Sequence, residues 1–182
     1  MLIASNIVLW VLVLVLMAVV LALVRQVGVL YERVAPAGAM KWESVLKIGE
    51  EVPVFELQTL DGRPLQLGGE RKHRKSILLF FLSPSCPVCK TLLPVLQAIR
   101  NSEASWLEVV LAGDGDEEEH RAWLRTQGME SWPYVLSPQL GSTMQVGQLP
   151  FAALVDKSGI LRARNPVNSR EQIESMIGAC QT

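Results

Sequence analysis

Two cysteines, Cys86 and Cys89, lie between a continuous apolar run and a segment with helical periodicity. The run, residues 76–82, is typical of a buried strand, and residues 90–100 place their apolar side chains at helical spacing. The sequence therefore predicts a strand that delivers a Cys-x-x-Cys loop to the beginning of a helix. This junction restricts the chain to folds that combine strands and helices around one core.

A cysteine pair at the start of a helix is most simply interpreted as a thiol–disulfide redox centre. Unpaired backbone N–H groups and the positive end of the helix dipole favour the thiolate of Cys86, which is the attacking species in disulfide exchange. We expect Cys86 to be the nucleophile and Cys89, one helical turn later, to resolve the mixed disulfide. Pro87 and Val88 should form the helix N-terminus. Oxidase, isomerase and reductase directions all remain open, because the reduction potential and the recycling partner decide among them.

The N-terminus predicts a membrane anchor. Residues 7–24 are eighteen consecutive apolar residues, which span about 27 Å as a helix and match a bilayer core. A cleaved signal peptide is disfavoured, because no Lys or Arg precedes the run. We predict a transmembrane anchor at 1–24, a juxtamembrane linker at 25–46 and a folded domain at 47–182.

Two arguments about orientation conflict. Arg25, Arg33 and Lys41 follow the apolar run and would keep the domain in the cytosol by the positive-inside rule. An anchored dithiol exchanger is most useful where client disulfides persist, on the outer side of the membrane. We expect a single-pass protein of the cytoplasmic (inner) membrane with its domain in the periplasm.

The rest of the chain predicts a mixed sheet covered by helices on both faces. A first hairpin should turn at Asp61-Gly62, and residues 106–112 form a second buried strand. Asp114 or Asp116 should cap the next helix, which Gly128 ends. The remaining expected elements are a strand at 132–136, a short helix at 139–146, a hairpin of 151–155 with 160–163, and a helix at 170–179.

Charge and composition disfavour several other functions. The net charge of −1 gives no nucleic-acid footprint. We expect no metal, because only Cys180, His73 and His120 remain as further soft ligands and none has paired spacing. Cys180 is interpreted as a bystander thiol, with a third redox centre or an intermolecular link as the alternative. The basic residues 71–75 are interpreted as a solvated loop, with anionic lipid contact as the alternative.

The segment from Phe81 through the Cys86–Lys90 motif, with Leu149-Pro150 sixty residues later, resembles the thioredoxin superfamily. The resemblance implies a thioredoxin-like fold, no cofactor beyond the Cys86–Cys89 disulfide, and a cis-proline at Pro150 that helps to hold the substrate backbone. Leu149 and Pro150 are therefore the expected substrate groove. The chain departs from the superfamily at Phe80, where a buried acid is common, and at Ser85, where tryptophan is common. It also lacks the peroxiredoxin pattern before Cys86 and keeps only Ser83 of it.

The anchor, the linker string at 25–39 and the segment at 81–90 also resemble the accessory proteins of methylamine utilisation. This resemblance implies a role in the maturation of methylamine dehydrogenase, whose disulfide-rich small (beta) subunit would be the client. A redox recycling partner and the lipid bilayer, through residues 7–24, are the other expected partners. The alternative is a non-catalytic tether or chaperone that uses the fold only for docking, and it predicts that replacement of Cys86 leaves function intact.

Overall fold

The computed structural model describes the backbone of residues 2–34, 46–69 and 75–181, with side chains at 3, 6–21, 46–69 and 75–178. The chain divides into two compact units, Met1–Glu43 and Ser44–Thr182. The first contains one helix, and the second contains all of the strands that the structure describes.

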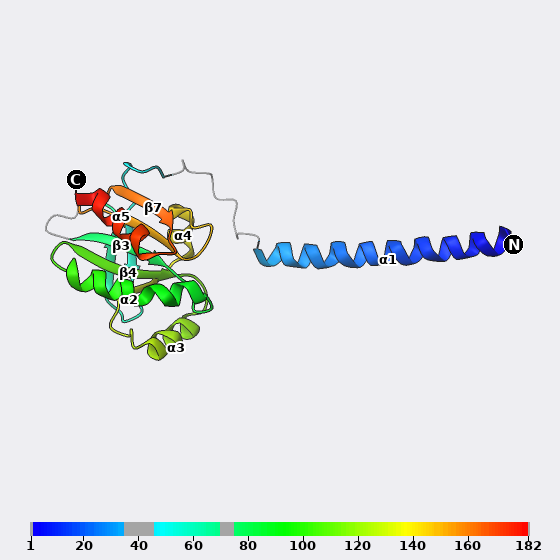
Figure 1. The fold of residues 1–182 in the computed structure, drawn as a ribbon, viewed down its shortest axis with the longest axis horizontal. Coiled ribbons are helices and arrows are strands. Elements are labelled where there is room, and N and C mark those ends of the chain that lie inside the picture. The colour runs from blue at the N-terminus through cyan, green and yellow to red at the C-terminus, as the bar shows by residue number, and fades with distance from the viewer. Residues whose placement is uncertain (1, 35–45, 70–74, 182) are drawn as a thin grey trace. The chain divides into compact units, whose positions relative to one another are not determined.

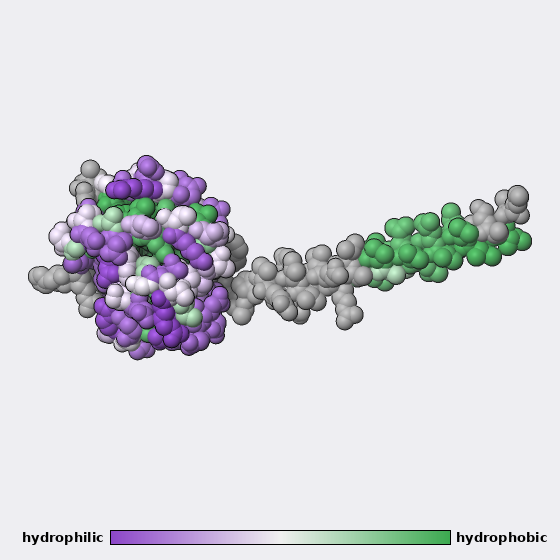
Figure 2. Space-filling model, turned by 60° about the horizontal axis from the view of Figure 1, so that its bottom comes forward, coloured by the Kyte–Doolittle hydropathy of each residue, from purple (hydrophilic) through white to green (hydrophobic). Residues whose placement is uncertain are grey.

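The first unit consists of helix α1 (Leu2–Val34). The helix passes residue 24, where the predicted anchor ends, because no proline precedes Pro36 to interrupt it. Its side chains from Ile7 to Leu21 are exposed and form the apolar surface in Figure 2. Over the residues given above, no helix reaches the combined length and hydropathy of a membrane span. Of the linker predicted at 25–46, residues 25–34 belong to α1, and residues 35–45 lie outside the described part of the chain.

The second unit is built on a five-stranded mixed sheet (Figure 1). Its strands, in spatial order, are β5 (Tyr134–Leu136), β4 (Leu107–Gly113), β3 (Ser76–Phe81), β6 (Phe151–Val155) and β7 (Leu161–Pro166). Strands β3, β4 and β5 are parallel, whereas β6 pairs antiparallel with both β3 and β7. The predicted mixed sheet is confirmed.

Strand β3 is buried along its whole length, as its continuous apolar sequence predicts. Alternate side chains, such as Leu78 and Phe80, face a core with helices α2 (Pro87–Ser102), α3 (Glu117–Gln127) and α5 (Arg170–Gln181). The others, such as Ile77 and Leu79, face a second core under α4 (Pro138–Met144) and the hairpin of β1 (Phe55–Gln58) and β2 (Pro64–Leu67). Helices therefore cover both faces of the sheet, and the β1–β2 hairpin packs beside α4 on the face of Ile77 and Leu79.

Local signals in the sequence set several element boundaries. The Asp116 side chain caps α3 by accepting a hydrogen bond from the Glu119 N–H at 3.0 Å, and Gly128 ends that helix with a φ of 64°. The buried Asp156 carboxylate holds the β6–β7 turn by accepting hydrogen bonds from the backbone N–H groups of Ser158 and Ile160. These capping and turn predictions are confirmed.

Candidate active site

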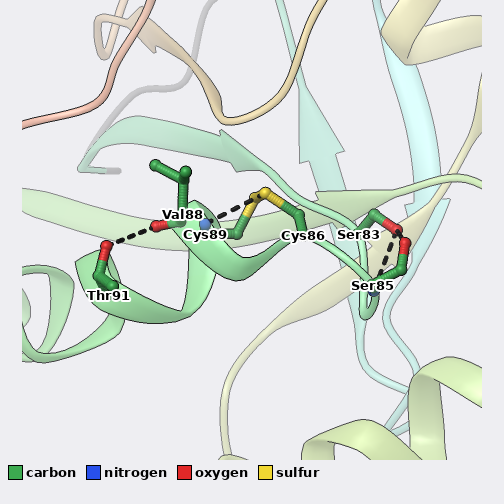
Figure 3. Close-up of a disulfide and its surroundings, with 6 residues drawn as sticks. All are labelled: Ser83, Ser85, Cys86, Val88, Cys89 and Thr91. Carbon is green, nitrogen blue, oxygen red and sulfur yellow. Dashed lines mark hydrogen bonds between the residues drawn. A yellow bond between two sulfur atoms is a disulfide. The ribbon is translucent and has the colours of Figure 1, made fainter.

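The two motif cysteines form a disulfide at the beginning of α2 (Figure 3). Their Cα atoms lie 5.3 Å apart. Strand β3 leads into the motif through a tight turn, in which the Cys86 N–H donates to the Ser83 carbonyl at 3.0 Å. Cys86 is the N-cap of α2, and Pro87 is its first helical residue, where proline's missing N–H costs the helix nothing. The structure thus has the strand–loop–helix junction that the sequence predicts.

Burial distinguishes the two sulfurs. Cys89 is fully buried and belongs to the core beneath α2, whereas Cys86 is half-buried at the edge of that core. The Cys86 Sγ also accepts a hydrogen bond from the Cys89 N–H at 3.1 Å (Figure 3). In the reduced protein, the same N–H and the helix dipole favour a negative charge on Cys86. Access and electrostatics therefore favour the same sulfur as the reacting atom.

Two serines and an exposed valine lie close to the disulfide in sequence. Ser83 and Ser85 share a hydrogen bond between their hydroxyl groups at 2.9 Å, and Val88, between the two cysteines, is 41% exposed. Phe80 is fully buried in the same core as Cys89, so the strand supplies no carboxylate to receive a proton from that thiol. The donor that the structure shows at the Cys86 sulfur is thus a backbone N–H group.

The loop before β6 reaches the same end of the sheet as the disulfide. Phe81 is the register partner of Phe151, so the chain leaving β3 and the chain entering β6 lie at one edge. The Leu149–Pro150 peptide bond is cis, as expected. Pro150 is buried, whereas Leu149 is 42% exposed. Val88 and Leu149 thus expose large apolar side chains, one in each of the two predicted site segments.

A buried polar pair near this edge was not predicted. His120 is 2% exposed; its Nε2 donates to the Asp114 carbonyl at 3.1 Å, which leaves Nδ1 to accept from the Tyr134 hydroxyl. Burial raises the pKa of Tyr134 and keeps this hydroxyl protonated. The pair ties the loop after β4 to β5. The signal that could have found it is a lone histidine among acids on a helix that must bury one face.

Three sequence expectations concern residues that the structure describes only in part. The side chain of Cys180 and residues 71–74 lie outside the described part. Lys75, the last residue of the basic cluster, donates a hydrogen bond to the Ala104 carbonyl. Within the described part of the chain, no group of three or more His, Cys, Asp or Glu side chains is placed to hold a metal ion.

Comparison with known proteins places the chain in a family. The AhpC/TSA family model matches residues 48–171. A methylamine utilization protein MauD from Paracoccus denitrificans is 42% identical over 181 residues, which cover 100% of this chain and 90% of the relative. MauD of Methylobacillus flagellatus is 40% identical, with 96% of this chain and 84% of the relative covered. The chain belongs to the MauD family.

Solved structures share the fold of this MauD-family domain at low sequence identity. StoA from Bacillus subtilis has a TM-score of 0.57 at 19% identity, covering 69% of this chain and 98% of StoA. The exposed lipoprotein thioredoxin Etrx1 of Streptococcus pneumoniae has a TM-score of 0.59 at 21% identity, with 69% and 98% covered. The fold is therefore thioredoxin-like.

Proposed function

We propose that this MauD-family chain is a thiol–disulfide oxidoreductase that exchanges disulfides with a client protein, with Cys86 as the attacking or attacked sulfur. The observation that carries the proposal is the asymmetry of the pair. Cys86 caps α2 and is half-buried, whereas Cys89 is buried behind it. Such an arrangement leaves one sulfur available to a foreign thiolate and holds the other within reach for resolution.

The oxidised pair can act as an electron acceptor. A client thiolate attacks the Cys86 Sγ, the Cys86–Cys89 bond breaks, and Cys89 leaves as a thiolate that takes up a proton. A second client thiolate then attacks the client sulfur of the mixed disulfide, and Cys86 leaves. Two electrons pass from the client to the pair, and a partner disulfide must reoxidise it.

The reduced pair can correct an existing client disulfide. The Cys86 thiolate attacks the client disulfide, and one client sulfur leaves. A different client thiolate then attacks the client sulfur of the mixed disulfide, which forms a new client disulfide and releases Cys86, or Cys89 attacks Cys86 and leaves the client reduced. Isomerisation therefore returns the pair to its reduced form, whereas reduction requires a dithiol partner to recycle it.

The family suggests the biological setting. The relatives named above are methylamine utilization proteins, so we infer that the client belongs to the same process. The client we propose is the small subunit of methylamine dehydrogenase during its maturation. Disulfides in that subunit would supply the substrate that the Cys86–Cys89 pair requires.

We further propose that residues 1–24 anchor the protein in the cytoplasmic membrane and that the redox domain is periplasmic. Support comes from the apolar run at residues 7–24 and from the exposed apolar side chains of α1. A reporter fused to the C-terminus tests the orientation. Activity of a periplasmic reporter is expected, and activity of a cytosolic reporter alone would contradict the proposed location.

Trapping of the mixed disulfide tests the exchange reaction. A Cys89→Ala variant of the full chain lacks the resolving thiol, so a client bound to Cys86 should persist on a non-reducing gel. The comparison uses a Cys180→Ala background, so that no adduct forms through the third cysteine. The proposed client is the methylamine dehydrogenase small subunit, recognised in the adduct by mass spectrometry.

The matched control carries Cys86→Ala together with Cys89→Ala in the same background. It should trap nothing, and methylamine-dependent growth should fail. A docking-only role predicts instead that growth survives Cys86→Ala and that the Cys89→Ala variant traps no client. That pair of results would overturn the proposed reaction.

A further inference from the structure

A pocket of about 440 Å³ lies at the carboxyl ends of β3 and β4, and its lining includes the turn before Cys86. Ser83 forms one wall, Asp114 another, and Leu149 of the cis-proline loop a third. The Ser83 carbonyl accepts the hydrogen bond from the Cys86 N–H, so this wall belongs to the turn that carries the reacting cysteine. A client chain whose cysteine reaches Cys86 would therefore pass next to this pocket.

Of the described residues that line the pocket, Asp114 alone has an ionisable side chain. Among the described residues, its carboxylate makes neither a hydrogen bond nor an ion pair, while its backbone carbonyl is held by His120. The hydroxyl groups of the pocket are engaged within the protein: Ser137 caps α4, and Ser142 donates to the Pro138 carbonyl. The strongest polar group that the pocket offers to a ligand is thus an exposed, positioned carboxylate.

The rest of the lining suits a long aliphatic stem. Apolar residues line the pocket from three segments, namely Phe81 and Leu82 at the end of β3, Pro138 and Val146 at the two ends of α4, and Leu149. The exposed residues Gln145 and Gln148 add two neutral amide groups to the lining. Lys and Arg side chains bury their methylene stems along apolar surface and keep their charge at a polar end. This combination of lining groups matches such a side chain.

We propose that this pocket is a specificity subsite that takes a Lys or Arg side chain of the client, a few residues from the reacting cysteine, with Asp114 binding the cation. The inference rests on the proposed exchange activity. It adds that a Lys or Arg side chain near the client cysteine makes a client react faster. The Lys or Arg side chain aligns the client thiolate with the Cys86 Sγ. The bond changes are those of the exchange itself.

The test measures the second-order rate at which the oxidised full-length protein, in detergent, reacts with short peptides that carry one cysteine. Matched peptides place Lys, Gln or Glu two, three or four residues from the cysteine on either side. Dithiothreitol serves as a thiol that cannot use the subsite. For at least one position, the Lys peptide should react about threefold faster than the Gln peptide, the scale of a partly exposed ion pair.

Two variants distinguish the effect of the Asp114 carboxylate from that of the other acidic side chains at 114–119. Asp114→Asn should reduce the Lys-to-Gln rate ratio to about one and leave the dithiothreitol rate unchanged. The matched control is Glu119→Gln, which removes one charge from the first turn of α3 without touching the pocket lining. It should keep most of the Lys preference.

The outcomes distinguish the subsite from the exchange activity. Exchange with every peptide but no Lys preference at any position, or a preference that survives Asp114→Asn, overturns the subsite and leaves the proposed function standing. An equal loss of preference in Glu119→Gln also overturns it, because the acidic loop as a whole would then be responsible. Failure to react with any thiol, dithiothreitol included, overturns both proposals.

Discussion

The backbone N–H of Cys89 donates a hydrogen bond to the Cys86 sulfur at 3.1 Å. The same residue that would resolve a mixed disulfide therefore also supplies, through its backbone, a donor to the reacting sulfur. Because this donor belongs to the first turn of α2, its direction is fixed by the helix and does not depend on a flexible side chain. The first turn of α2 thus supplies a fixed backbone donor to the Cys86 sulfur.

The Asp156 carboxylate should be a major contributor to the stability of the β6–β7 hairpin. It is 8% exposed and accepts hydrogen bonds from two backbone N–H groups and from the Arg162 guanidinium at 2.6 Å. Asp156→Ala leaves those donors without partners and should lower the free energy of unfolding by about 2–3 kcal/mol. Urea denaturation measures the change.

The control for that measurement is Glu117→Ala, which removes an exposed ion pair with Arg121 on the surface of α3. Exposed pairs four residues apart on a helix contribute about 0.3–0.5 kcal/mol. Equal losses of unfolding free energy in the two variants would contradict a major contribution of Asp156 to the stability of the hairpin.

Tyr134→Phe should destabilise the domain, although the change removes only a single oxygen atom. The Tyr134 hydroxyl is the donor to the buried Nδ1 of His120, and no water can reach a side chain that is 2% exposed without opening the core. Loss of the partner should cost about 1–3 kcal/mol, measured by thermal or urea unfolding. Thr143→Ala, which removes an exposed hydroxyl on α4, is the control and should change stability by less than about 0.5 kcal/mol. An unchanged Tyr134→Phe protein would show that the pair adds nothing.

Tyr134 should also make stability fall at alkaline pH. Burial raises its pKa in the folded protein above the ordinary value of about 10, so above pH 10 the unfolded chain loses this proton while the folded one keeps it. Stability from this group is complete below pH 10 and declines as the pH rises, by about 0.8 kcal/mol at pH 10.5. The Tyr134→Phe variant should lack that part of the decline between pH 8 and pH 10.5. Parallel declines in the two proteins would contradict the assignment.

Local patterns in the sequence predicted the elements that depend on local chemistry. The buried strand before Cys86, the cap at Asp116 and the hairpin of 151–155 with 160–163 each follow from hydrophobic spacing or from local capping and turn signals. The cis bond at Pro150 was expected through family resemblance and is present. The position of the cysteines at the strand–helix junction was visible for the same local reasons.

Features that depend on distant residues were not predicted. The register that joins Phe81 to Phe151 brings together segments seventy residues apart, and only the packed sheet defines it. The pairing of His120 with Tyr134 and the position of Asp114 in the pocket lining likewise depend on how distant segments pack. The acids at 114–119 identified a helix start correctly, but their spacing carries no information about which of them faces the disulfide edge.

The pH dependence of Cys86 alkylation tests the central claim most directly. The reduced full-length protein, in a Cys180→Ser background, is treated with iodoacetamide between pH 4 and pH 10, and the modified cysteine is identified by mass spectrometry. Because the Cys89 N–H and the α2 dipole stabilise the thiolate, Cys86 should react first, with a midpoint clearly below the ordinary thiol pKa of about 8.5. Preferential modification of Cys89, or a Cys86 midpoint at or above 8.5, would contradict the account.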